Sequence, residues 1–200
     1  MTASASGSLT GGLSIDGGKG TDTLELASDF TGSVALGTNI TNIEVVDASA
    51  VTTAVSITGL AEVAETITGG SGNDTIDGKG GNDVLAGGDG NDTFMFYGTE
   101  AVTGGTGTDT LELASTVTGS VSLDGTTLSG IDVIDASAAS AVTLTGNDSV
   151  ATTFVLGAGA ATVTGGDGTD TLKLTSDFAG DSVALAASDG QYNSIEVVDA

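Results

Sequence analysis

The feature that most constrains this chain is a nine-residue pattern that occurs three times without interruption between residues 69 and 95. The copies start at Gly69, Gly78 and Gly87 and read GGSGNDTID, GKGGNDVLA and GGDGNDTFM. Each follows G-G-x-G-x-D-x-U-x, where U is a large apolar residue, and Lys79 in place of the second glycine is the only departure. A short fixed period of this kind is typical of a solenoid, in which each repeat packs on its neighbours.

Each copy combines a turn with a short strand. The glycines permit backbone conformations that a Cβ would forbid, so the first half predicts a tight turn whose carbonyl oxygens can point inward. The aspartate at the sixth place (Asp74, Asp83 or Asp92) adds a carboxylate, and a hard cation such as Ca2+ prefers these two kinds of oxygen ligand. The alternative interpretation is that Asn-Asp and Gly-Gly merely form turns. That alternative does not explain why aspartate returns at the same place in every copy.

The three copies resemble the nonapeptide of the RTX (repeats-in-toxin) family. This resemblance implies a right-handed parallel β-roll in which two nonapeptides make one coil. It also implies that calcium ions lie between stacked turns, bridged by the aspartate carboxylates and completed by carbonyls of the first four positions. The second half of each copy would then be a strand whose apolar residue, Ile76, Leu85 or Phe94, is buried against the neighbouring coils.

The spacing of the glycine turns predicts how they stack. Gly69 and Gly87 are 87 − 69 = 18 residues apart, and Gly87 and Gly104 are 104 − 87 = 17 apart. We therefore expect these three turns to stack on one side, with calcium between each pair. The turn at Gly78 should lie on the other side, below residues 97–102, where the motif is absent and Glu100 is a possible substitute ligand.

The candidate calcium ligands are the motif positions of these turns and the aspartates of two isolated turns. They are Gly69, Gly70, Ser71, Gly72 and Asp74; Gly78, Gly80 and Asp83; Gly87, Gly88, Asp89, Gly90 and Asp92; Gly104, Thr106 and Asp109; and Asp22 and Asp170.

A second, longer repeat surrounds the nonapeptides. It opens as GGKGTDTLELAS at Gly17, GGTGTDTLELAS at Gly104 and GGDGTDTLKLTS at Gly165, and each copy later reaches a segment of the type IEVVDA. β-branched residues in alternation predict strands at residues 22–26, 33–36, 43–46 and 54–57, with the same layout from residues 109 and 170. Residues 59–66 (GLAEVAET) are the best, weak, candidate for a helix.

We therefore expect an all-β chain forming one continuous parallel β-solenoid over residues 1–200. Its parts are a first long unit (17–68), the nonapeptide β-roll (69–95), a second long unit (104–164) and a truncated third unit (165–200).

Several further aspartates repeat at fixed places. Asp148, near the position one coil before the Gly165 turn, could lend a carboxylate to calcium or form an ordinary bend. Asp47, Asp135 and Asp199 end the VVDA-type segments, where a turn or a polar ladder is favoured over a metal ligand.

The composition excludes several functions. The chain has 27 acidic and 3 basic residues, a net charge of −24, and neither His nor Cys. Nucleic acid and anionic membrane surfaces are excluded as partners because both require a basic surface. Without His, Cys or Arg the usual nucleophile–base pairs and zinc sites are missing, so we expect no enzyme in this segment. The self-repulsion of so many carboxylates predicts weak folding until cations neutralise them.

The same features suggest where the chain works. The absence of Cys suggests export without disulfides, and the first residues lack the charged and apolar regions of a cleavable signal. No apolar run reaches membrane-spanning length, so no direct membrane insertion is expected. The RTX resemblance implies type I secretion, and we interpret the chain as a fragment whose export signal lies outside it.

The mixture of nonapeptides and Thr/Ser/Ala/Val-rich units looks most like a bacterial surface-layer protein that calcium folds and assembles into a lattice on the cell surface. Two alternatives remain open. One is a calcium-stiffened segment of a large adhesin, and the other is a folding and secretion module of a protease, lipase or toxin.

Overall fold

The computed structural model describes residues 2–5, 14–147, 150–159, 161–178, 183–185 and 194–199, with side chains for residues 14–147, 150–159 and 161–178. Its regular structure consists of short β-strands, and the described residues contain no helix. The chain divides into two compact units, Met1–Met95 with Thr99–Asp109, and Phe96–Gly98 with Thr110–Ala200.

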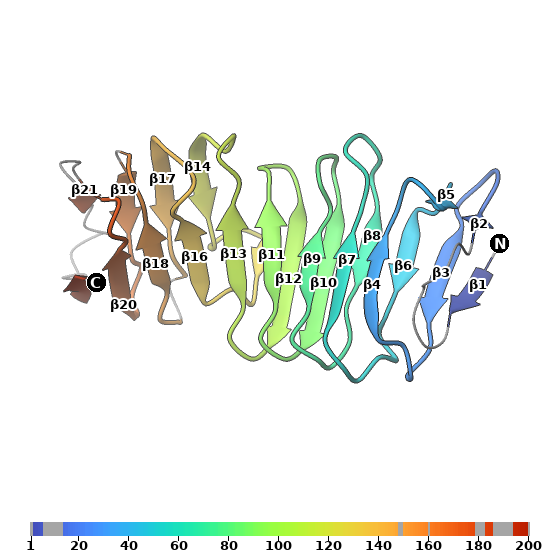
Figure 1. Ribbon diagram of the computed structural model, residues 1–200. Helices are drawn as coiled ribbons and strands as arrows, with labels where there is room; N and C mark the ends of the chain where they lie inside the picture. The colour runs from blue at the N-terminus through green and yellow to red at the C-terminus, as the bar shows by residue number, and fades with distance from the viewer. Residues whose placement is uncertain are drawn as a thin grey trace. The chain divides into compact units, whose positions relative to one another are not determined.

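Unit 1 is built from parallel strands that succeed one another from coil to coil (Figure 1). Its strands are β1 (Thr2–Ala5), β2 (Ile15–Asp16), β3 (Thr23–Leu26), β4 (Gly32–Ala35), β5 (Ile40–Thr41), β6 (Val45–Asp47), β7 (Val55–Thr58), β8 (Thr66–Thr68), β9 (Thr75–Asp77), β10 (Val84–Asp89), β11 (Thr93–Phe96) and β12 (Ala101–Thr106). One sheet has the order β1-β3-β6-β8-β10-β12, a second has β4-β7-β9-β11, and β2 pairs with β5. Successive strands of one sheet are therefore one coil apart in the sequence, which defines a parallel β-solenoid.

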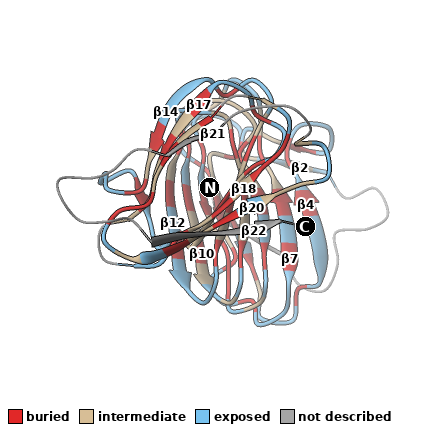
Figure 2. Cartoon of the chain, turned by 90° about the vertical axis from the view of Figure 1, so that its left-hand side faces the viewer, coloured by how far each residue is buried: buried red, intermediate tan, exposed pale blue. Residues whose placement is uncertain are grey.

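The core of unit 1 consists of ladders of like residues. In the first sheet the register places Leu24, Val46, Ile67, Leu85 and Val102 in one row, and all are at most 1% exposed. Buried and exposed residues alternate along the strands, as the banding in Figure 2 shows. Each apolar side chain is covered by the equivalent one a coil away, so strands of three or four residues suffice.

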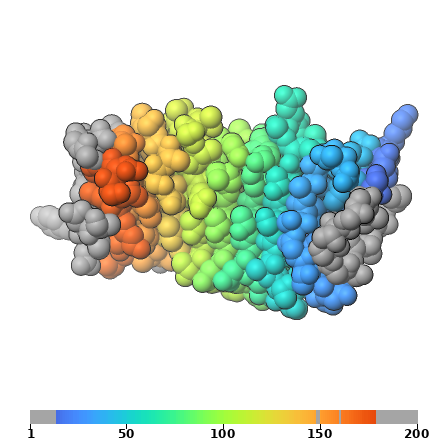
Figure 3. Space-filling view, viewed as in Figure 1, coloured from blue at the N-terminus to red at the C-terminus, as the bar shows by residue number. Residues whose placement is uncertain are grey.

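The apolar positions of the nonapeptides fill this core from both sheets. Ile76 pairs with Phe94 in the second sheet, and Leu85 lies in the first. All three are fully buried. Two nonapeptides therefore make one coil, as the RTX resemblance implies. In Figure 3 the colours of unit 1 follow one another in chain order, because each coil contacts the coil before and after it.

Unit 2 follows the same plan. Its strands are β13 (Thr110–Leu113), β14 (Gly119–Ser122), β15 (Leu128–Ser129), β16 (Val133–Ala136), β17 (Val142–Thr145), β18 (Thr153–Leu156), β19 (Ala161–Thr164), β20 (Thr169–Leu174), β21 (Val183–Leu185) and β22 (Ser194–Asp199). Strands β13-β16-β18-β20-β22 follow one another in one sheet and β14-β17-β19-β21 in another, all parallel. Its core rows are Leu111, Ile134, Phe154 and Leu172 in the first sheet, and Val121, Leu144 and Val163 in the second.

The all-β parallel solenoid is confirmed, and the strands expected in the first long unit are present within about two residues of their expected ends. The helical candidate at residues 59–66 is wrong. Residues 61–63 form a turn and β8 begins at Thr66, because Ile67 joins the core row and leaves too few residues for a helix. The arrangement as one continuous solenoid stays a prediction. Among the described residues, no helix has the length and apolar character that crossing a membrane would require.

Candidate metal centre

The glycine turns at Gly69, Gly87 and Gly104 stack on one side of unit 1, as their spacing predicts. The Gly69 amide donates to the Ala86 carbonyl (2.7 Å), and the Gly90 amide donates to the Thr106 carbonyl (2.9 Å). The stack continues one coil further down, because the Ser71 amide donates to the carbonyl of Val51 (3.0 Å). That lower turn contains no glycine motif, so the spacing of the glycine turns does not predict it as a neighbour.

The aspartates of the stacked turns form a ladder of hydrogen bonds from carboxylate to main chain. Asp92 Oδ1 accepts from the Asp74 amide (2.8 Å), and Asp109 Oδ1 accepts from the Asp92 amide (2.8 Å). Asp74 Oδ1 accepts from the Val55 amide (2.9 Å) in the same way. One oxygen of each carboxylate therefore joins two coils. At Asp92 the second oxygen remains for a cation.

Asp92 occupies the middle of this ladder, and its second oxygen has no protein partner. The side chain is 1% exposed, and Oδ2 is buried without a hydrogen bond. Burial raises the pKa of Asp92 to about 6, against the lowering effect of the Asp74 amide, and repulsion from Asp74, Asp109 and Asp89 raises it further. At Asp74 the second oxygen accepts from the Gly70 amide (2.7 Å), and burial raises the pKa of this carboxyl as well. A buried charge without a counter-charge is costly, so the ladder favours a cation beside Asp92.

At the second glycine of the stacked turns, no residue with a side chain fits without strain. Gly88 and Gly105 have φ angles of +111° and +125°, which L side chains rarely adopt. A Cβ on Gly88 would collide with the carbonyl oxygen of Gly70, and one on Gly105 with that of Gly88. Lys79 shows the same conformational demand, because it holds φ at +71° in the equivalent place of its own turn. The carbonyls thus approach the next turn closely enough to serve as cation ligands.

Three of the predicted ligands have other partners. The Ser71 hydroxyl lies 3.5 Å from the Val51 carbonyl, in the turn below. Thr106 Oγ1 donates to Asp89 Oδ1 (2.8 Å) at the exposed outside of the stack. These contacts join coils at the surface, as do the amide side chains of Asn73 and Asn91, each of which accepts a backbone N–H from the next coil.

The predicted ligands Gly72 and Gly80 lie against the coil below. A Cβ on Gly72 would collide with residues 53 and 54, and a Cβ on Gly80 would lie 3.0 Å from the Ala61 carbonyl oxygen.

The turn at Gly78 lies on the opposite side of unit 1. Above it, as expected, is the segment containing Glu100: the Ala101 amide donates to the Asp83 carbonyl (2.8 Å), and Thr99 Oγ1 donates to the Gly81 carbonyl. Glu100 is 3% exposed, and its Oε2 accepts from the Thr99 amide (2.9 Å). The substitute ligand predicted from the sequence is therefore buried within its own turn.

Below the Gly78 turn lies a residue that sequence reasoning missed. Asp83 Oδ1 accepts from the Glu65 amide (2.9 Å), and Glu65 is 1% exposed. The spacing 83 − 65 = 18, which equals that between Gly69 and Gly87, does indicate that Glu65 lies one coil below Asp83. The glycine motif does not indicate it, because residues 59–65 contain only one glycine and carry Glu in place of Asp.

The isolated turns differ from the stack. In unit 1, Asp22 is buried and its amide donates to Glu44 Oε2 (2.9 Å). In unit 2, Asp170 is buried, its Oδ1 accepts from the Thr152 amide (2.8 Å), and its Oδ2 has no protein partner. The side chain one coil below Asp170 is thus a threonine rather than an acid. Asp148 lies outside the described residues.

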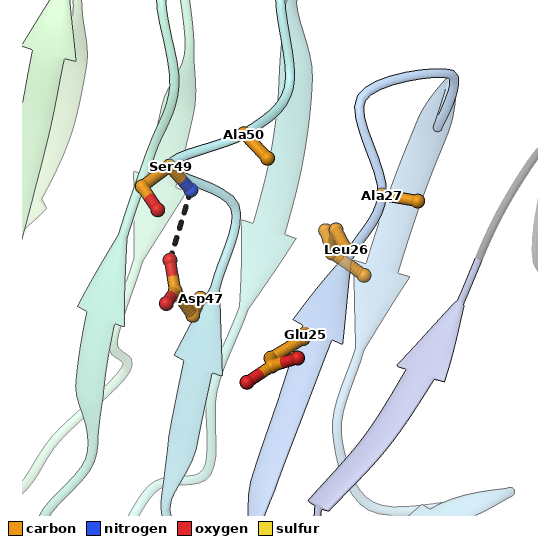
Figure 4. A pocket seen from close by; sticks show the side chains of 6 residues that line it. All are labelled: Glu25, Leu26, Ala27, Asp47, Ser49 and Ala50. Atoms are coloured by element: carbon orange, nitrogen blue, oxygen red, sulfur yellow. Dashed lines mark hydrogen bonds between the residues drawn. The ribbon is translucent and has the colours of Figure 1, made fainter.

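The strand-end aspartates form turns. Asp47 Oδ1 accepts from the Ser49 amide and Asp135 Oδ1 from the Ser137 amide, each at 2.9 Å. Figure 4 shows Asp47 and Glu25 beside a pocket that Ser49 and Ala50 also line. The pocket is open, and one oxygen of Asp47 is used by its own turn. The side chain of Asp199 lies outside the described residues.

The described residues contain no group of three or more His, Cys, Asp or Glu side chains placed to hold a metal. A nonapeptide site does not require such a group, since calcium readily takes backbone carbonyl ligands. The buried Asp92 Oδ2 and the close-packed glycine carbonyls fit a hard, oxygen-seeking cation.

Comparison with known families agrees with this chemistry. Residues 63–94 match the family model described as RTX calcium-binding nonapeptide repeat (4 copies). The match covers the three contiguous nonapeptides almost completely and extends back to include Glu65. No curated protein matches the chain. The chain therefore carries RTX repeats, a structural β-roll element of a family that binds calcium.

Proposed function

We propose that this chain is a non-enzymatic structural segment whose RTX turns bind calcium and thereby trigger folding. The observation that carries the proposal is Asp92, a buried carboxylate between two others with an oxygen that has no protein partner. Without a cation, Asp74, Asp92 and Asp109 repel one another through a poorly solvated space. With one, the repulsion becomes attraction, and cation binding contributes directly to the free energy of folding.

The ligands proposed for the stack are the carboxylates of Asp74, Asp92 and Asp109 and the carbonyls of the glycine turns they close. Calcium lies between the turns at Gly69 and Gly87, and again between those at Gly87 and Gly104. The isolated turns with Asp22 and Asp170 are candidates for weaker sites.

We further propose that the segment works outside the cell, after type I secretion, in a surface-layer protein. Millimolar calcium outside cells would saturate sites of modest affinity. Repulsion within a chain of net charge −24 would hinder folding and association until calcium binds. The stalk of a large adhesin, and a folding and secretion module of a protease, lipase or toxin, are the alternative contexts.

The calcium proposal is tested by far-UV circular dichroism and thermal unfolding with and without a chelator. The β signal and the melting temperature should fall on chelation and recover with calcium. Asp92→Ala should lower the calcium-dependent gain in stability, whereas Asp47→Ala, which removes only a turn acceptor, should not. A melting temperature that is unchanged by chelation would refute the proposal.

The surface-layer proposal is tested separately by electron microscopy of the folded chain after calcium is added. A lattice protein forms ordered sheets or oligomers. An adhesin segment stays monomeric and elongated, and a secretion module gains structure without self-association.

A further inference from the structure

Five acidic residues occupy equivalent places along one edge of unit 1. Each immediately precedes a strand of the sheet β3-β6-β8-β10-β12, whose register pairs Thr23, Val45, Thr66, Val84 and Ala101 in one row. The acids are Asp22, Glu44, Glu65, Asp83 and Glu100. This edge lies opposite the Asp92 stack, and apart from Asp22 and Asp83 its acids belong to no glycine motif.

Glu65 and Asp83, in the middle of this row, are buried and incompletely paired. Both are 1% exposed. Asp83 Oδ1 accepts from the Glu65 amide, but Asp83 Oδ2 and both carboxylate oxygens of Glu65 have no hydrogen-bond partner. The Leu60 amide lies near enough to lower the pKa of Glu65, but neither carboxylate oxygen has a hydrogen bond to it. Three carboxylate oxygens from two coils are therefore buried together without partners.

Two glycines make room for these oxygens. A Cβ on Gly59 would lie 2.9 Å from Glu65 Oε2 and 2.9 Å from the Gly78 carbonyl oxygen. A Cβ on Gly78 would collide with Asp83 Oδ2. Gly59 and Gly78 thus border a space that a main-chain carbonyl and both carboxylates approach.

The buried carboxylates around this space require a proton or a cation to balance their charge. Burial is the main cause that raises the pKa of Glu65 to about 8, and it also raises the pKa of Asp83. A proton shared by the two carboxyls would satisfy one oxygen of each and leave one Glu65 oxygen buried without a partner. A cation can take all three, together with the nearby carbonyl, and removes the repulsion between the charges.

We propose that Glu65 and Asp83 hold one calcium ion between the turn at residues 59–65 and the turn at residues 78–83. The site extends the proposed calcium dependence to a second edge of unit 1, and its lower half comes from a turn without the glycine motif. Glu65 stands where the motif has aspartate, and its side chain is one methylene longer. Val63, two residues earlier, stands where the next turn has Gly81.

The test compares Glu65→Gln with Glu62→Gln in the whole chain. Both variants remove one negative charge from the same turn, but Glu62 is exposed. Calcium bound per chain is counted by equilibrium dialysis with elemental analysis. Glu65→Gln should lose one ion relative to the parent chain, and Glu62→Gln should lose none. Asp83→Asn, which keeps an acceptor for the Glu65 amide, should lose the same ion and covers the case in which Glu65→Gln fails to fold.

Thermal unfolding gives a second readout. In chelator, Glu65→Gln should melt higher than the parent chain, because folding no longer has to bury a carboxylate or protonate it. In calcium it should melt lower, because an ion is lost. An unchanged ion count in both Glu65→Gln and Asp83→Asn would overturn the inference and support the shared proton. Loss of ions in Asp92→Asn under the same conditions would still uphold the proposed function, whereas a parent chain that binds no calcium would overturn both.

Discussion

Asp92 in unit 1 and Asp170 in unit 2 make the same bond in different surroundings. Each carboxylate accepts, at 2.8 Å, the amide of the residue one coil below. Below Asp92 that residue is Asp74, and Asp109 follows above, whereas below Asp170 it is Thr152. Burial raises the pKa of both carboxyls, and repulsion by neighbouring acids adds to this effect at Asp92.

The difference separates two tasks of the motif aspartate. The bond to the main chain needs one oxygen and no metal, so it can hold coils together wherever the motif occurs. The demand for a cation comes from the second oxygen, and it grows when several carboxylates follow one another. Unit 1 should therefore depend on calcium more strongly than unit 2.

The largest expected effect comes from closing the space between turns. Gly88→Ala forces a Cβ against the Gly70 carbonyl at a φ of +111°, and we expect a loss of about 3 kcal/mol or more in the free energy of unfolding. Gly119→Ala in unit 2 has a similar φ of +91° but no atom within 4 Å of the new Cβ, so about 1 kcal/mol is expected. Urea unfolding in calcium measures both. Equal losses would mean that backbone conformation, not close stacking, sets the cost.

A smaller effect is expected from removing charge while keeping the acceptor. Asp92→Asn should lose the equivalent of one calcium ion, which stabilises the fold by about 2.7 kcal/mol when calcium is about a hundredfold above Kd. Asp170→Asn should cost less than about 1 kcal/mol, because its turn offers one carboxylate. Thermal unfolding at matched calcium concentration compares the variants, and the parent chain in chelator is the control. A loss at Asp170 as large as at Asp92 would contradict the comparison.

The smallest effect is a dependence on pH in chelator. The folded chain takes up protons at higher pH than the unfolded chain, because burial raises the pKa of Asp92 from 3.8 to about 6 and that of Glu65 from 4.5 to about 8. The metal-free fold should therefore gain stability as pH falls from about 8 to about 5 and lose it as pH rises through the folded pKa values.

Two variants assign this dependence to its groups. Asp92→Asn should remove the part of the gain between about pH 6 and pH 4, and Glu65→Gln the part between about pH 8 and pH 4.5. In calcium the trend should reverse, because protons compete with the cation. A melting temperature that is flat with pH in chelator would show that these carboxyls are solvated.

Much of this architecture could be predicted because its rules are local and periodic. The one-coil spacing between Gly69, Gly87 and Gly104 correctly gives their stacking, and the alternation of apolar residues gives the strands. The apolar residue of each nonapeptide, such as Ile76, has nowhere to be buried except against another coil. Periodicity of this kind needs no knowledge of distant contacts.

Sequence reasoning failed at residues 59–65, which form a turn one coil below the Gly78 turn but lack the glycine motif. Residues 59–65 have one glycine and a run of good helix formers, so local propensity suggested a helix, but packing of Ile67 in the core row decides the outcome. For the same reason Glu65 passed unnoticed as the counterpart of Asp83. The partners of Ser71 and Thr106 depend on side-chain rotamers at the surface, which no spacing reveals.

The bond from each motif carboxylate to an amide one coil away has a kinetic consequence. It joins residues only 17 or 18 positions apart, so closing each coil costs little chain entropy and adds one coil to a surface that already exists. The slow event is then nucleation of the first pair of coils, which mutual repulsion opposes until a cation arrives. Once nucleated, folding should advance as a front along the chain, with a rate set by the calcium concentration at the nucleus rather than by chain length.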